Sequence, residues 1–311
     1  MAVYKQEIKV LSSDGIHKLS GVIFLPDCAP VGFFQVVHGM TEYIGRYERF
    51  MTDMASRGWI CFGHDHLGHG RSVNDASELG FIASENGADL LQRDVKRVAD
   101  AVMKNYAAMG ANLPYVLMGH SMGSFIVRLA TQKGYVQPNR LIVMGTGGPN
   151  PVAGLGLKLI KIIKRMRGER HVSKLLDKMA FGNYNDAFGG GMESDPKPWL
   201  TSDEEVRMRY YADPLCMFQF TTSAMGDLIT LTKEANSDEW FEKMPRNIPV
   251  LLVSGELDPV GDFTDGIATV HTRLNDAGVP CTVKIYENAR HEILNDFTYG
   301  AVVRDILAFC K

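Results

Sequence analysis

The stretch YVLMGHSMGSFIVRLA, residues 115–130, places Ser121 between two glycines that each stand two residues away. An apolar run over residues 115–118 stops at Gly119, and a helical pattern begins just after Gly123. A serine at a tight strand-to-helix turn has strained backbone angles and an exposed hydroxyl, and small flanking residues avoid clashes as the chain doubles back. The G-x-S-x-G pattern therefore predicts a nucleophile. Because a chain with 31 glycines also produces this pattern by chance, other residues must supply a base, an acid and an oxyanion site.

A histidine and a carboxylate follow two strand-like segments near the end of the sequence. A serine hydroxyl becomes a good nucleophile when a histidine removes its proton and a carboxylate orients the imidazole. The segment VLLVSGELDPVG places Asp258 just past one strand, and VKIYENARHEIL places His291 just past the last strand. The chain order of serine, acid and histidine is the order of the α/β-hydrolase plan. We therefore expect Ser121, Asp258 and His291 to form a catalytic triad.

Three other carboxylates compete with Asp258 for the role of the acid. Glu256 lies two residues before it and is the main alternative, and Asp262 and Asp265 follow. Asp258 precedes Pro259, and a residue before proline favours an extended conformation that projects from a loop. This favours Asp258.

An oxyanion site needs the backbone N–H after the nucleophile and a second N–H after the third strand. The first is that of Met122. The segment FFQVVHGMTEYIGRYERF gives a strand that ends at His38-Gly39, followed by Met40. Gly39 permits the turn that would direct the Met40 N–H inward, although a glycine also ends many ordinary strands. Beside the predicted triad, the oxyanion role is favoured.

The elements that must position these residues alternate between strands and helices. This alternation predicts a mainly parallel sheet covered on both faces, preceded by a hairpin at the turn SSDG. Residues 149–245 interrupt the alternation with helical patterns, so we expect a core of residues 1–148 and 246–311 and an inserted helical cap over the carboxyl edge of the sheet. The expected strands are residues 4–10, 18–24, 32–37, 59–63, 115–118, 141–144, 248–255 and 281–287, and the expected helices are 85–107, one after Ser121, 266–274 and 301–310.

Composition excludes several classes of protein. A net charge of −3 argues against a general nucleic-acid binder. The sequence has no run of about 18 or more apolar residues, so we expect no transmembrane helix. The N-terminal segment MAVYKQEIKVLSSDG has no apolar core of a signal peptide, and the five cysteines are scattered without a C-x-x-C pair. We therefore expect a cytoplasmic protein with reduced thiols.

Five segments together resemble the monoacylglycerol lipase/lysophospholipase family of α/β hydrolases, which is grouped with serine aminopeptidase-like hydrolases. They are HGMTEYIGRYERF, DHLGHGRS, GHSMGS, SGELDPVG and ARHEILND, and they span residues 38–296 in family order. The resemblance implies an eight-stranded, mostly parallel sheet with a helical cap. It matches Ser121, Asp258 and His291 to the family's catalytic positions and Met40 and Met122 to its oxyanion donors. It also implies hydrolysis of monoacylglycerol or lysophospholipid esters through an acyl-serine, without a cofactor or metal.

Two other functions remain open. A peptidase would have to bind a free amine, for which the candidate acidic residues are Glu193, Asp195, Asp203, Glu204 and Glu205. A hydrolase-like binding protein without turnover is the other alternative, and an intact triad argues against it.

Two further patterns favour a structural role over a functional one. The segment GHDHLGHGRS offers His64, Asp65, His66 and His69 as metal ligands, but its glycines and its place after a strand favour a structural loop. The helix-like segment from Leu155 to Met166 has an apolar stripe beside lysines and arginines, which would allow transient contact with an anionic membrane surface. Such a helix more often packs its apolar stripe on the domain below, and that interpretation is favoured. The oligomeric state is not predicted.

Overall fold

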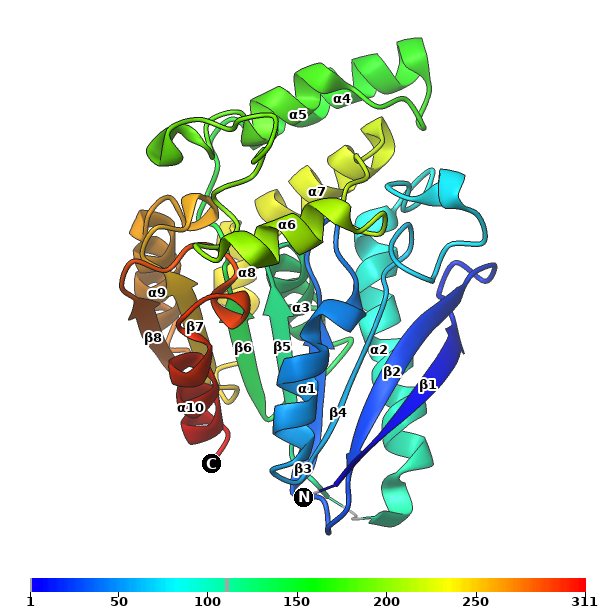
Figure 1. Cartoon of the computed structure of the whole chain (residues 1–311), viewed down its shortest axis with the longest axis vertical. Coiled ribbons are helices and arrows are strands. Elements are labelled where there is room, and N and C mark those ends of the chain that lie inside the picture. The colour runs from blue at the N-terminus through cyan, green and yellow to red at the C-terminus, as the bar shows by residue number, and fades with distance from the viewer. Residues whose placement is uncertain (1, 110–111) are drawn as a thin grey trace.

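In the computed structural model, which describes residues 2–109 and 112–311, eight strands form one sheet in the order β1-β2-β4-β3-β5-β6-β7-β8 (Figure 1). The first two strands form the predicted antiparallel hairpin, and β2 pairs antiparallel with β4. All other neighbouring strands are parallel, so the prediction of a mostly parallel eight-stranded sheet is confirmed. The strands are β1 Val3–Leu11, β2 Lys18–Pro26, β3 Gly32–Val37, β4 Trp59–His64, β5 Tyr115–His120, β6 Arg140–Met144, β7 Val250–Gly255 and β8 Cys281–Tyr286.

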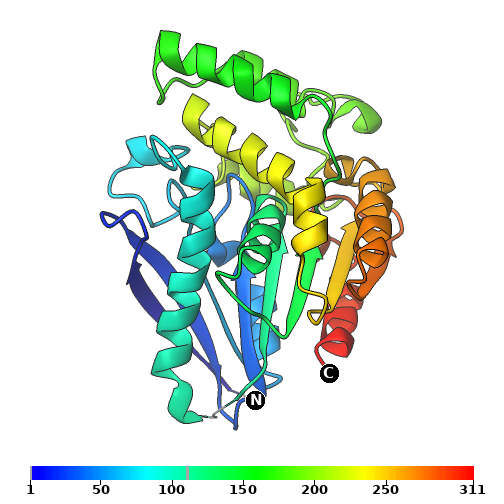
Figure 2. The same cartoon turned by 180° about the vertical axis from the view of Figure 1, so that it is seen from behind.

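Helices cover both faces of this sheet because its central strands are apolar on both sides. In β3, Phe33 and Val37 face one hydrophobic cluster, whereas Phe34 and Val36 face the other, as the two-residue period of a strand requires. Helices α1 and α10 cover the face seen in Figure 1, and α2 and α3 cover the face seen in Figure 2. The helices are α1 Glu48–Ala55, α2 Gly87–Asn105, α3 Met122–Gln132, α4 Ala153–Arg167, α5 Lys174–Phe181, α6 Glu204–Ala212, α7 Thr222–Ala235, α8 Asp238–Lys243, α9 Asp265–Asp276 and α10 Tyr299–Phe309.

Seven of the eight strands differ from the prediction by one or two residues at one or both ends, and two of these differences concern Ser121 and a proline. Strand β5 continues through Gly119 to His120, so the strand reaches the residue directly before Ser121. Strand β7 begins at Val250 rather than at Ile248, because Pro249 has no N–H to donate to a neighbouring strand. The Val250 N–H donates the first bond, to the Pro280 carbonyl at 2.8 Å.

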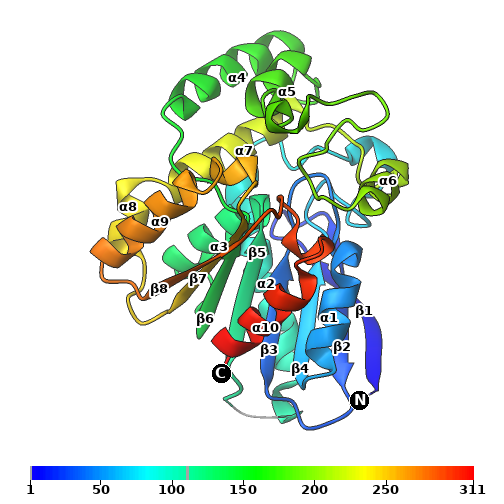
Figure 3. The same cartoon turned by 60° about the vertical axis from the view of Figure 1, so that its left-hand side comes forward.

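Five helices, α4 to α8, occupy the interval between β6 and β7. Figures 1 and 3 show α4 and α5 farthest from the sheet, with α6 and α7 between them and the end of the sheet that carries Ser121. Residues 149–245 are therefore mainly helical, although their status as a separate domain stays a prediction.

The prediction that α4 buries its apolar stripe on the layer below is wrong for most of that stripe. Leu155, Ile162 and Met166 are 66%, 56% and 75% exposed. The face that packs on α7 instead carries Ile160, which is buried, with Ile163 partly buried beside it. The spacing of the apolar residues therefore predicted the helix correctly but indicated the wrong face as the buried one.

A buried arginine on α3 joins the two ends of this helical interval. The Arg128 guanidinium donates to the Thr146 hydroxyl at 3.1 Å, to the Asn236 side-chain oxygen at 3.1 Å and to the Ala235 carbonyl. The Trp240 indole N–H donates to the Arg128 carbonyl at 2.9 Å. Burial lowers the pKa of Arg128 to about 9. One side chain thus ties α3 to the chain leaving β6 and to the end of α7.

Candidate active site

Ser121 occupies a strained turn between β5 and α3. Its φ and ψ are 54° and −122°, a positive φ that non-glycine residues rarely adopt. The glycines on either side are required by close packing: a methyl group on Gly119 would lie 2.2 Å from the Gly123 carbonyl oxygen. One on Gly123 would lie 2.2 Å from the Val37 carbonyl oxygen of β3. The chain therefore turns sharply against β3, and Ser121 remains partly exposed at the carboxyl edge of the sheet.

The structure brings together the predicted acid and base. Asp258 follows β7 and is fully buried, and its Oδ2 lies 2.9 Å from the Nδ1 of His291, which follows β8. The Val260 N–H donates to the other Asp258 oxygen at 2.9 Å and fixes the carboxylate. An Nδ1–H that donates to Asp258 leaves His291 Nε2 able to take a proton. The competing Glu256 instead accepts a hydrogen bond from the Asn288 N–H at 2.9 Å.

The turn after β3 lies against Ser121. A methyl group on Gly39 would lie 2.9 Å from the Ser121 Cβ, which shows how closely the two segments approach. Met40 follows Gly39, and Thr41 then adopts a positive φ of 52°. Within the part of the chain that the structure describes, the N–H groups of Met40 and Met122 have no hydrogen-bond acceptor. Both predicted oxyanion donors are thus left without an acceptor in the described structure, and their role stays a prediction.

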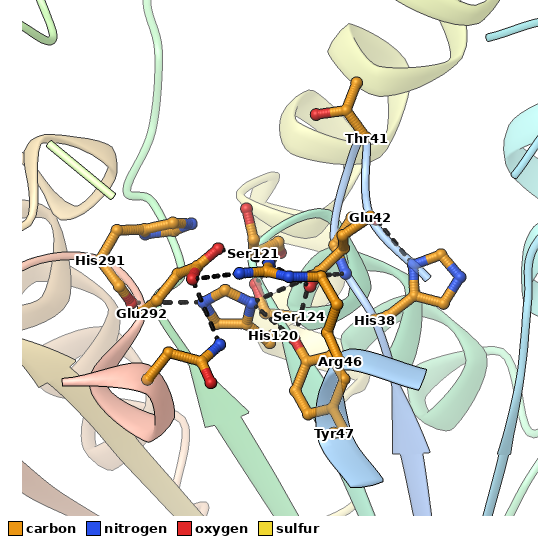
Figure 4. A network of polar contacts seen from close by, with 12 residues as sticks. His38, Thr41, Glu42, Arg46, Tyr47, His120, Ser121, Ser124, His291 and Glu292 are labelled. Carbon is orange, nitrogen blue, oxygen red and sulfur yellow. Dashed lines mark hydrogen bonds and ion pairs between the residues drawn. The ribbon is translucent and has the colours of Figure 1, made fainter. Parts of the chain in front are cut away.

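Glu42 is a buried carboxylate that holds this turn in place (Figure 4). Its Oε1 accepts the Gly39 N–H at 2.6 Å and the Tyr47 hydroxyl at 2.9 Å, and it lies 3.3 Å from the Nδ1 of His120. Burial alone would raise the pKa of Glu42, but His120 and the charge of Arg46 bring it well below its ordinary value. The carboxylate is therefore ionised, and in turn it raises the pKa of His120 against the opposing effect of burial.

Arg46 connects Glu42 to the histidine loop. Its guanidinium donates to Glu42 at 3.0 Å and makes two bonds to Glu292, at 2.6 and 2.7 Å. Burial opposes the charge of Arg46, but Glu292 and Glu42 raise its pKa well above the ordinary value. Because Glu292 directly follows His291, this buried ion-pair network holds the Gly39 turn and the His291 loop at a fixed separation.

His120 and Trp199 enclose His291 from two sides. The His120 ring lies 4.6 Å from the His291 ring, and its Nε2 lies 3.3 Å from the His291 carbonyl oxygen. The Trp199 ring lies 5.1 Å from the same imidazole, and the Glu292 N–H donates to the Leu200 carbonyl at 2.7 Å. His291 is consequently almost fully buried, with its position set by groups from both the sheet and residues 149–245.

Comparison with known families gives a match over residues 29–298 to the family described as serine aminopeptidase, S33 (Hydrolase_4). The chain belongs to this family. A monoacylglycerol lipase of Mycolicibacterium smegmatis is 25% identical over 96% of this chain and 98% of its own. A monoglyceride lipase of Mus musculus is 24% identical over 86% of this chain and 77% of its own. The crystal structure of a thermostable carboxyl esterase from Bacillus coagulans, in complex with glycerol, superposes with a TM-score of 0.90 at 27% identity, covering 100% and 98% of the two chains. The predicted resemblance to monoacylglycerol lipase-like α/β hydrolases is thereby confirmed.

The acidic residues that an S33 peptidase would need for a free amine are engaged elsewhere or exposed. Asp195 accepts from Arg207 at 2.9 Å and from the Tyr211 hydroxyl at 2.6 Å. Asp203 caps α6 by accepting the Val206 N–H at 3.1 Å. The other three candidates are on the surface: Glu193, Glu204 and Glu205. The arrangement gives no support to the peptidase alternative.

Sequence reasoning did not single out Glu42, Arg46, His120, Glu292 or Trp199. Four of them stand inside the quoted segments, beside the residues assigned to chemistry. One feature of the sequence could have indicated a buried ion network: charged residues follow soon after strongly apolar strands, where an isolated charge would be costly to bury. Nothing in the sequence indicated which of them would pair.

The predicted histidine loop after β4 is buried beneath the Gly39 turn. The His66 N–H donates to the His38 Nε2 at 3.0 Å, and the His66 Nε2 lies 3.1 Å from the His38 carbonyl oxygen. Asp65 accepts the N–H groups of Ile44 and Arg71 at 2.8 and 2.7 Å. No group of three or more potential ligands within residues 2–109 and 112–311 is placed to hold a metal ion. In this structure the loop supports the turn.

Arg46→Met tests the buried network. The substitution leaves Glu42 and Glu292 without their shared cation, and breaking a buried ion pair costs about 3–5 kcal/mol. We therefore expect urea denaturation to give a loss of that size in the free energy of unfolding. Arg93→Met is the matched control, because Arg93 is 55% exposed in its pair with Asp89 and should change stability far less. Similar losses in both variants would contradict the structural role of the network.

His64 predicts a pH dependence of stability. It is fully buried, neither of its ring nitrogens has a hydrogen-bond partner in the described structure, and burial lowers its pKa to about 4. In the unfolded chain His64 binds a proton near pH 6.5, whereas in the folded protein it does so only near pH 4. The contribution of His64 to the free energy of unfolding is therefore complete above pH 6.5 and is lost as the pH falls toward 4. His64→Leu should remove up to about 3 kcal/mol of this acid-dependent loss.

Thermal unfolding of both proteins between pH 7 and 4 measures the effect. His17 provides a control of opposite sign. Burial lowers the pKa of His17, but Asp14 outweighs burial and raises it. The contribution of His17 to the free energy of unfolding is therefore present at low pH and is lost as the pH rises. Parallel stability curves for the wild type and His64→Leu would refute the prediction.

Proposed function

We propose that the protein hydrolyses carboxylic esters through an acyl-serine intermediate. Ser121 attacks the ester carbonyl while His291 takes its proton, and Asp258 holds the imidazole and stabilises its charged form. The N–H groups of Met40 and Met122 stabilise the oxyanion. His291 then gives its proton to the leaving alcohol, and water, activated by the same histidine, releases the carboxylic acid and regenerates the serine. These reaction steps need no cofactor.

The single observation that carries the proposal is the strained Ser121 turn at the same sheet edge as the Asp258–His291 pair. Strained backbone angles at a non-glycine residue cost about 1–3 kcal/mol and are retained mainly where function requires them. The two available N–H groups beside Ser121 supply the remaining part of an acyl-transfer site.

The names of the relatives support acyl esters of glycerol as substrates. Both the mycobacterial and the mouse relative are named as lipases of monoacylglycerols, and the superposed esterase was solved with glycerol. We therefore propose monoacylglycerol or lysophospholipid esters as the substrate class. Fold and triad alone do not select the alcohol, so this step is by analogy.

We further propose that residues 149–245 act as a cap that receives the acyl chain. Ile160 of α4 and Met225 of α7 are buried in the cluster against which the Met40 side chain packs, and Leu159 and Ile163 lie partly buried beside them. Apolar side chains of α4 and α7 on the Ser121 side of the sheet suit a long acyl chain, because each buried methylene is worth about 0.8 kcal/mol.

The outer surface of α4 and α5 supports transient contact with an anionic lipid surface. No helix of the described residues has both the length and the apolar character needed to cross a bilayer. Exposed apolar side chains instead occur on the two helices farthest from the sheet, among lysines and arginines, an arrangement typical of interfacial helices (Figure 3). The exposed apolar residues are Leu155, Ile162, Met166, Leu175 and Met179.

Ser121→Ala tests the catalytic proposal. We expect loss of measurable hydrolysis of p-nitrophenyl esters and of monoacylglycerols, with the melting temperature close to that of the wild type. The wild type should also react with a fluorophosphonate probe and the variant should not. A folded variant with substantial turnover would exclude Ser121 as the nucleophile, and a wild type that neither labels nor turns over would indicate a binding protein.

Replacing Leu155 and Met166 together with glutamate tests the membrane contact. We expect weaker sedimentation with vesicles that contain anionic lipid and slower hydrolysis of vesicle-borne long-chain esters. Hydrolysis of soluble p-nitrophenyl acetate should be unchanged, because both side chains point into solvent. Unaltered vesicle binding would exclude this surface.

A further inference from the structure

Lys197 is held by a rigid backbone in the segment between α5 and α6. It stands between Pro196 and Pro198, and each proline fixes its own φ angle. The Lys197 N–H donates to the Tyr211 hydroxyl at 2.9 Å, and the Pro198 carbonyl accepts from Arg290 at 2.5 Å. The segment therefore presents the lysine side chain in one direction.

The Lys197 ammonium has few protein partners, although the residue is partly buried. It donates to the Tyr210 hydroxyl at 3.3 Å and lies 5.1 Å from the centroid of the Tyr210 ring. Among residues 2–109 and 112–311 it forms no ion pair within 4.0 Å, and the carboxylates of Asp177 and Glu292 act on its charge only from a greater distance. Burial lowers the pKa of Lys197. An ammonium has three donors, so this cation has hydrogen-bonding capacity that the protein does not use, and no carboxylate of the described residues is in direct contact with it.

Tyr210 places this ammonium beside the predicted oxyanion site. The Tyr210 hydroxyl donates to the Thr41 carbonyl at 2.9 Å, and Thr41 is the residue after Met40. The Arg46 guanidinium lies 4.8 Å from the same Tyr210 ring. Lys197 is thus separated from the Gly39 turn by a single tyrosine.

Lys197 also adjoins the side of the site where an alcohol would leave. Trp199, two residues further along, covers the His291 imidazole. Because His291 must protonate the leaving alcohol, the alcohol half of an ester lies on the His291 side of Ser121. The apolar residues of α4 and α7 belong to a different cluster from Leu200, Tyr210 and Cys216 near Lys197. The two halves of an ester would therefore meet different parts of residues 149–245, and the Lys197 ammonium lies on the side of the alcohol.

We propose that Lys197 binds an anionic oxygen, of a phosphate or a carboxylate, carried by the alcohol half of the ester. The inference rests on the proposed ester hydrolysis and narrows its substrate class to esters with a charged alcohol. Tyr210 orients the ammonium, and the paired prolines keep it in place before substrate arrives. Arg46 does not compete for the anion, because Glu42 and Glu292 already neutralise it.

Three dodecanoyl esters with the same acyl chain test this proposal: lauroyl glycerol 3-phosphate, lauroyl glycerol and methyl laurate. Lys197→Met should lower kcat/KM for the phosphate ester by about tenfold or more, and for the other two esters by less than about threefold. Lys197→Arg should retain most of the preference because it keeps the charge. Glycerol 3-phosphate should inhibit p-nitrophenyl acetate hydrolysis competitively, and more weakly in Lys197→Met.

Lys104→Met is the matched control, since this exposed lysine near the end of α2 changes the net charge equally without touching the site. Equal losses for all three esters, no loss for any, or a loss confined to lauroyl glycerol would each overturn the proposal. Hydrolysis of methyl laurate and labelling of Ser121 by a fluorophosphonate report on the proposed function separately. If both persist while the phosphate preference is absent, only the assignment of Lys197 fails.

Discussion

A single guanidinium, that of Arg46, pairs with two buried carboxylates that come from opposite ends of the chain. Glu42 belongs to the turn after β3, and Glu292 lies 246 residues beyond Arg46 in the sequence. Isolated buried charges are strongly disfavoured, so each carboxylate gains from this shared partner. The pairing therefore favours one arrangement of the turn and the His291 loop. The geometry of the proposed oxyanion site and base depends on that pairing as much as on the sheet.

The histidines illustrate how much their surroundings decide. His64 and His120 are both buried at the ends of parallel strands, yet their pKa values move in opposite directions. Burial alone acts on His64, whereas Glu42 outweighs burial at His120. His291 has a third environment, with Asp258 at Nδ1 and an aromatic ring above it. An imidazole thus serves as an uncharged core side chain at His64, as part of an ion network at His120 and as the proposed base at His291.

The sheet and the Ser121 turn could be predicted because their signals are local. The glycines two residues from Ser121 form a short sequence motif, and the apolar strands follow from short runs of apolar residues, so both can be recognised within a few positions of the chain. The place of Asp258 and His291 followed from chain order. The network of Glu42, Arg46 and Glu292 could not be predicted, because its pairing depends on three-dimensional proximity between distant segments. The buried face of α4 was also missed, since the exposed apolar side chains of that helix follow the same spacing as a core-facing stripe.

The position of residues 149–245 in the topology has a consequence for how such a protein can diversify. The segment leaves from β6 and returns to β7, which are direct neighbours in the sheet and pair from Leu141 with Val250 onward. Arg128 ties the chain that leaves β6 and the end of α7 to α3, which brings the start of the segment close to a point near its end. The entropy of closing a loop grows only slowly with its length. Insertions or deletions within this interval that spare Trp199, Leu200 and Asn236 would therefore leave the hydrogen-bonded strands undisturbed, and a lineage of such proteins could exchange one molecular preference for another while inheriting the same reaction centre.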